Sequence, residues 1–66
     1  MLSITINQLH FELPLGSTLQ DAVDVFGAKP PFAAALNLNF VPKSQYAQTP
    51  LHHSDKIELI SPITGG

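Results

Sequence analysis

The residues with the clearest chemical potential are the last five, Pro62-Ile63-Thr64-Gly65-Gly66. Gly65 and Gly66 have no Cβ with which to pack against a domain, and Pro62 lacks the N–H that would continue a sheet ladder. We therefore expect residues 62–66 to form a flexible tail that projects from the domain. At about 3.3 Å per extended residue the tail would reach roughly 16 Å, enough to carry a terminal carboxylate into a buried site of another protein.

The remaining polar residues form no recognisable catalytic set. Asp21 and Asp24 share the water-facing side of a predicted amphipathic helix, and Ser17 reads as a helix cap with no partner histidine. The side chains of His52 and His53 point apart in an extended segment, and no third ligand completes a metal site. We predict no metal, no permanently bound cofactor and no enzymatic activity of the chain itself.

Length and composition predict one small folded domain over residues 1–66, with a thin core. Apolar residues make up 44% and charged residues 12%, which favours a globule over a disordered segment. The net charge of −2 and the dispersed lysines argue against nucleic-acid binding. No apolar stretch is long enough to span a membrane, so we expect a cytoplasmic protein. The lack of cysteine excludes disulfides and thiolate nucleophiles.

Two alternating segments at the start of the chain predict a β-hairpin. Residues 2–6 and 9–13 each alternate apolar and polar side chains with a period of two, and Asn7-Gln8 lies where a tight turn is needed.

A short helix follows. We interpret Ser17-Thr18-Leu19-Gln20 as a capping box, Leu19 to Phe26 as an amphipathic helix, and Gly27 as the residue that ends it.

The second half of the chain predicts three more strands. The alanines of residues 32–37 could indicate a helix, but the preceding prolines and the turn-prone Asn37-Leu38-Asn39 favour a second hairpin that ends near Val41. Residues 43–48 could form one helical turn, Ser54-Asp55 a turn, and residues 56–60 a last strand. The expected order is β-β-α-β-β-β in an α+β architecture, with the first and last strands parallel at the centre of a mixed sheet that covers the helix.

This order and tail are typical of the β-grasp, ubiquitin-like fold, and the chain resembles the thiamine-biosynthesis sulfur carrier proteins. The resemblance covers essentially the whole chain and rests on Asn37, Val41-Pro42, Tyr46, Leu51, residues 55–60 and Gly65-Gly66. The chain departs from the family pattern at Ser54, where glycine is commoner, and at Pro62.

The resemblance implies that Gly66 is the reactive residue. Its carboxylate is ionised at neutral pH and is a poor electrophile, so an activating step is required. A partner resembling the ubiquitin-activating enzymes would adenylate it with MgATP, and a persulfide from a cysteine desulfurase system would convert it to a thiocarboxylate. Thiazole synthase would take the sulfur. Ile63, Thr64 and Gly65 would thread the active-site channels of these partners.

A docking surface for these partners is expected on the folded domain. If residues 34, 36, 57 and 59 face the core, then Ala33, Ala35, Phe40 and Ile60 share the opposite sheet face, and we hypothesise that they bind the partners together with Ile63. The alternative is that these are scattered surface residues without a role.

Two other functions remain open from the sequence. The small subunit of molybdopterin synthase has the same fold and terminal chemistry with a different acceptor. A ubiquitin-like modifier or interaction module would instead form an amide with a lysine, or bind without any change at Gly66.

Overall fold

The computed structural model describes residues 1–61, so the predicted tail at residues 62–66 lies outside the described residues. The elements in order are β1 (Leu2–Ile6), β2 (Leu9–Leu13), α1 (Leu19–Phe26), β3 (Ala33–Leu36), β4 (Asn39–Val41), the 3₁₀ helix η1 (Lys43–Gln48) and β5 (Lys56–Ile60). The predicted β-β-α-β-β-β order is confirmed, including the second hairpin, which we preferred to a helix.

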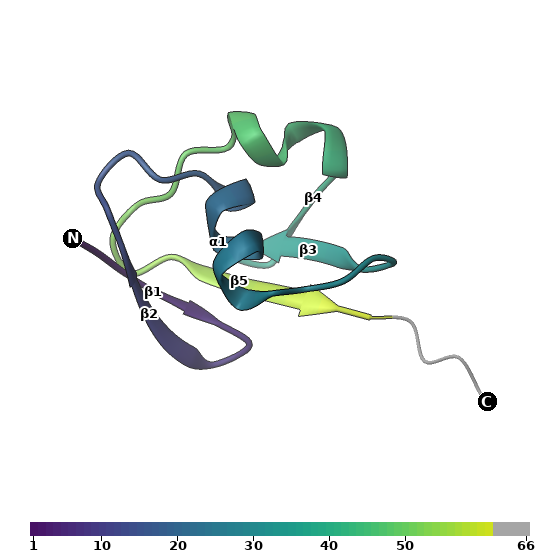
Figure 1. Cartoon of the computed structure of the whole chain (residues 1–66), viewed down its shortest axis with the longest axis horizontal. Coiled ribbons are helices and arrows are strands. Elements are labelled where there is room, and N and C mark those ends of the chain that lie inside the picture. Colours follow the sequence, from purple (N-terminus) through teal and green to yellow (C-terminus); the bar gives the residue numbers. More distant parts are fainter. Residues whose placement is uncertain (62–66) are drawn as a thin grey trace.

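The five strands form one mixed sheet in the order β2-β1-β5-β3-β4 (Figure 1). The two hairpins, β1–β2 and β3–β4, are antiparallel, and β5 lies between them, parallel to β1 and antiparallel to β3. Helix α1 covers one face of this sheet (Figure 1). The predicted α+β architecture with β1 and β5 at the centre is therefore confirmed.

The core lies between α1 and the covered sheet face. It is formed by side chains that alternate along the strands and by one stripe of the helix, as the sequence periodicity predicts. Its buried members are Leu2, Ile4, Ile6, Leu13, Leu19, Ala22, Val23, Ala34, Tyr46, Leu51, Ile57 and Leu59. Because α1 has only eight residues, its stability depends on this packing. Within residues 1–61 no helix is long and apolar enough to cross a membrane.

The start of α1 differs from the prediction by one residue. Thr18 is the N-cap: its hydroxyl accepts the N–H of Asp21 at 3.4 Å, and the Asp21 carboxylate accepts the N–H of Thr18 at 2.8 Å. The predicted box of Ser17 and Gln20 is wrong because the Ser17 hydroxyl donates to the carbonyl of Pro14 at 2.7 Å, while the Gln20 amide donates further along the helix. Thr18 itself is extended, so the first helical turn can begin only after it.

Both hairpins turn through two residues in the left-handed region. Asn7 and Gln8 have φ of 51° and 71°, and Asn37 and Leu38 have φ of 50° and 71°. Positive φ at both central residues is the requirement of the type I′ turn, whose twist matches that of the strands. Asparagine tolerates this conformation well, which explains its place at the first position of each turn.

The two turn asparagines also extend the pairing of β5 on both of its sides. On the β1 side, the Asn7 amide donates to the carbonyl of Leu59 at 3.2 Å and its side-chain oxygen accepts the Leu59 N–H at 2.8 Å. On the β3 side, the N–H of Asn37 donates to the carbonyl of Lys56 at 2.7 Å and its side-chain oxygen accepts the Lys56 N–H at 2.9 Å. In each turn the asparagine makes hydrogen bonds to β5 that a further residue of its strand would otherwise make.

Candidate functional site

The predicted reactive end lies outside the described residues. This applies to Gly66 and to the threading residues Ile63, Thr64 and Gly65, so their predicted roles remain predictions. The described chain reaches Ile60, the last residue of β5, and then Ser61.

The predicted docking residues come together on the sheet face opposite α1. Strand register places Ala33 beside Ile60, and it places Ala35 between Phe40 on β4 and Glu58 on β5. Directly opposed residues of antiparallel strands project on the same side, and alternate residues of one strand share that side. We call Ala33, Ala35, Phe40 and Ile60 the docking face.

Two members of the docking face are strongly exposed. The Phe40 side chain is 69% exposed and Ile60 is 57% exposed, while Ala33 and Ala35 are half-buried. Leu9 on the edge strand β2 is equally exposed at 57%, so exposure alone does not distinguish these residues. The distinguishing feature is that four apolar residues on three neighbouring strands are contiguous. The structure is therefore consistent with a shared surface rather than with scattered residues, and the docking role remains a hypothesis.

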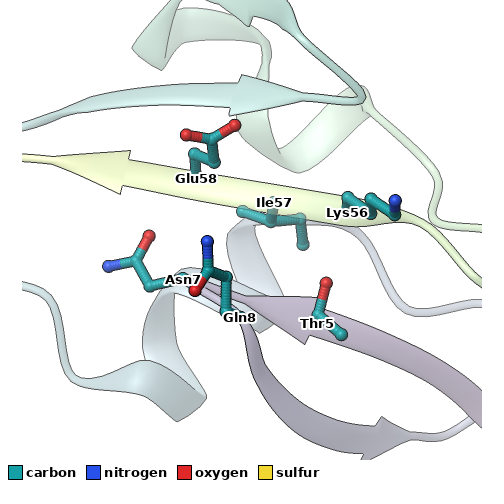
Figure 2. A pocket seen from close by; sticks show the side chains of 6 residues that line it. All are labelled: Thr5, Asn7, Gln8, Lys56, Ile57 and Glu58. Carbon is teal, nitrogen blue, oxygen red and sulfur yellow. The ribbon is translucent and has the colours of Figure 1, made fainter.

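A polar hollow adjoins the docking face along β5 and β1. It has a volume of about 560 Å³ and is lined by Thr5, Asn7, Gln8, Lys56, Ile57 and Glu58 (Figure 2). Figure 2 shows the Glu58 carboxylate on the side of β5 nearest β3, and the amide of Gln8 on the side of β1. The sequence reasoning did not include Lys56 and Glu58 in the surface, although the period of two in β5 places both on the same side as Ile60.

The two adjacent histidines are exposed and lie at the turn that precedes β5. Nδ1 of His52 lies 3.9 Å from the Asp55 carboxylate, and Nδ1 of His53 accepts the N–H of Ser3 at 3.2 Å. Residues 1–61 contain no group of three histidine or carboxylate side chains that could hold a metal ion.

One contact that sequence reasoning missed joins β1 and β2. The hydroxyl of Ser3 lies 2.7 Å from Nε2 of His10, a spacing also found in nucleophile–base pairs. A hydrolytic site needs a further group that orients the histidine, and among residues 1–61 no carboxylate bonds to His10. The pair is therefore a surface hydrogen bond of the hairpin.

Several residues that carry the family resemblance are structural. Asp55 is 8% exposed, and its carboxylate accepts the side-chain amide of Asn37 at 3.0 Å and the N–H of His52 at 2.7 Å. Tyr46 is 3% exposed and stacks on Phe32, with ring centroids 6.0 Å apart. These contacts join the turn before β5 to the β3–β4 hairpin and secure η1, so they hold β5 in position without contributing reactive groups.

Comparison with known proteins agrees with this reading of the fold. The model of the ThiS family matches residues 3–66. No curated protein matches the sequence. A similar solved structure is the crystal structure of a thiamine biosynthesis protein (ThiS) from Geobacter metallireducens, with a TM-score of 0.80 over 98% of this chain and 100% of that chain. At 13% identity that likeness shows the β-grasp fold, and the match of the family model over nearly the whole sequence shows that the chain belongs to the ThiS family.

Proposed function

We propose that this chain is a sulfur carrier for thiamine biosynthesis, with the carboxylate of Gly66 as the group that carries sulfur to thiazole synthase. The supporting observation is the family match, which extends through Gly65 and Gly66. The chain acts as a co-substrate of other enzymes, in the cytoplasm where ATP is available, and needs no cofactor of its own.

The proposed chemistry requires two partners to modify Gly66. A carboxylate oxygen of Gly66 attacks the α-phosphorus of MgATP in the adenylating enzyme, pyrophosphate leaves, and an acyl-adenylate forms. A persulfide of the donor system attacks the acyl carbon and expels AMP, which gives an acyl disulfide. A second thiol then attacks the donor cysteine sulfur and cleaves the S–S bond. The donor cysteine and the second thiol become a disulfide, and the sulfur atom bound to the acyl carbon stays on Gly66 as a thiocarboxylate.

The docking face would supply most of the binding energy. Ordering a five-residue tail costs conformational entropy, so the folded surface must provide the compensating contacts. Full burial of a side chain such as Phe40 or Ile60 contributes about 1.5–3 kcal/mol. Because Ile60 is the last residue of β5, the contacts of the docking face lie close to the point where the proposed tail begins.

Intact-mass measurement tests the carrier function. After incubation with ATP, a persulfide source and the adenylating enzyme, we expect one oxygen of the chain to be replaced by one sulfur. Omission of ATP or deletion of Gly66 should abolish the change. A higher-mass amide conjugate would indicate a protein modifier, and an unchanged mass would indicate a binding module; either result would overturn the proposal.

A matched pair of variants tests the docking face. Ile60→Asp should weaken binding to the adenylating enzyme by about tenfold or more, because it places a charge in an apolar interface. Leu9→Asp is the control, since Leu9 is also 57% exposed but lies on the far edge strand β2. Equal effects of the two substitutions on binding would contradict the docking role.

The acceptor is tested separately. We expect the thiocarboxylate form to support thiazole formation by thiazole synthase in a reconstituted assay. Transfer of sulfur to a molybdopterin precursor instead, with no thiazole product, would show that the chain is the molybdopterin type of carrier.

A further inference from the structure

The docking face continues into a charged region on β5. Glu58 is exposed, lies beside Ala35 in the strand register and is two residues before Ile60. Lys56 is exposed two residues earlier, beside Thr5. Residues two apart on a strand are about 6.6–6.8 Å apart, so a positive and a negative charge follow one another in a fixed order along the side of β5 that bears Ile60.

These two charges are not compensated within the described part of the chain. Between residues 1 and 61 the only charged contact within 4.0 Å is that of His52 with Asp55. Lys56 and Glu58 therefore do not pair with each other, and the hollow between β1 and β5 leaves space beside both (Figure 2). The other polar groups at the hollow are uncharged, and the Asn7 amide is occupied by the backbone of Leu59.

A partner that buries the docking face must also provide groups that compensate these charges. A surface that covers Ala35 and Phe40 must also cover or approach Glu58, which is the next residue in the same row. A carboxylate that loses water without gaining a partner is strongly unfavourable in an interface. The covering surface must therefore place a cation at Glu58. Where the same surface extends two residues further along β5 to Lys56, it must also place an acceptor there.

We propose that the ordered pair Lys56 and Glu58 fixes the orientation in which the adenylating enzyme docks. The enzyme presents an arginine to Glu58 and a carboxylate to Lys56, beside an apolar pocket for Phe40 and Ile60. Arginine fits best because its planar fork can bind the Glu58 carboxylate in a bidentate manner. This inference rests on the proposed function, which supplies the enzyme.

Charge-reversal variants test the order of the charges. Binding of the full chain to the adenylating enzyme is measured by calorimetry for Glu58→Lys, Lys56→Glu and the double exchange K56E/E58K. The control is Glu12→Lys, the same charge change at an exposed residue of the edge strand β2. Circular dichroism checks that each exposed variant is folded.

We expect Glu58→Lys to weaken binding by about tenfold or more and Glu12→Lys to change it by less than about twofold. The double exchange restores the net charge but reverses the order, so it should stay at least as weak as either single variant. Wild-type affinity in the double exchange, or equal effects of Glu58→Lys and Glu12→Lys, would overturn the proposal.

Two further measurements separate this inference from the proposed function. If the wild type gains sulfur and Glu58→Lys binds as tightly as the wild type, only the inference fails; if the wild type neither binds nor gains sulfur, both fail. Size-exclusion chromatography tests whether a second copy of this chain, in place of the enzyme, binds the docking face. Dimers that Glu58→Lys disrupts, without any change in enzyme binding, would also show that the inference is wrong.

Discussion

Asn7 gives the sharpest test of how the fold holds β5. Its side chain forms two hydrogen bonds with the backbone of Leu59, at 3.2 and 2.8 Å, and its own φ is 51°. Asn7→Ala removes both bonds, each with a net contribution of about 1 kcal/mol, and forces alanine into the left-handed region at a further cost of about 1 kcal/mol. We expect a total loss of about 3 kcal/mol.

That loss is large for this chain, because a domain of its length has a total stability of roughly 3–10 kcal/mol. Urea and thermal unfolding followed by circular dichroism should show it, with a fall in Tm of roughly 12–24 °C. Asn7→Gly removes the same bonds but accepts the positive φ, so it should cost less than Asn7→Ala. Gln8→Ala, at the next turn residue with φ of 71°, is the control and should stay within about 0.5 kcal/mol. If Asn7→Ala costs no more than Gln8→Ala, the reasoning is refuted.

Three further substitutions test the fold by the free energy of unfolding in urea. Ser54→Gly should stabilise the chain by about 0.5–1 kcal/mol, because Ser54 has φ of 71° and glycine adopts this conformation without strain; a loss of stability would contradict this. Thr18→Ala should lower the free energy of unfolding by about 1 kcal/mol through loss of the helix cap, whereas Gln20→Ala should leave it nearly unchanged. A larger loss for Gln20→Ala than for Thr18→Ala would favour the predicted capping box of Ser17 and Gln20. Asp55→Ala should cost about 2–3 kcal/mol, because it leaves the Asn37 amide and the His52 N–H without their acceptor, and a cost under 1 kcal/mol would count against that role.

Most of the fold was predictable because its local patterns agree with its topology. The period of two in β1 and β5 and the stripe of α1 identify the core, and the prolines and asparagines outweigh the helical preference of the alanines before Leu36. The helix cap was misplaced because Ser17 and Thr18 are both good N-cap residues. Only the tertiary contacts decide between them: the carbonyl of Ser17 accepts the N–H of Leu51, which keeps the chain extended through Thr18.

The candidate site was predictable only where it depends on strand alternation. Alternation places Ala33, Ala35, Phe40 and Ile60 on one side once the hairpin is known, and the structure brings them together. The hollow beside Glu58 could not be predicted, because it depends on the register of the parallel pair β1 and β5, in which Thr5 lies beside Lys56 and Ile6 beside Ile57. The hydrogen bonds of Asn7 with Leu59 could not be predicted either, since they join residues 52 positions apart in the sequence.

The central place of β5 has a consequence for synthesis on the ribosome. Each hairpin can form from local contacts as soon as it has been translated, but the two hairpins make contact in the sheet only through β5. Until residues 56–60 have left the exit tunnel, β1 and β3 each expose an unpaired edge, and long-range pairing is the slow part of folding. A nascent or truncated chain without β5 therefore cannot present the docking face, which links completion of the fold to the segment immediately before the proposed tail.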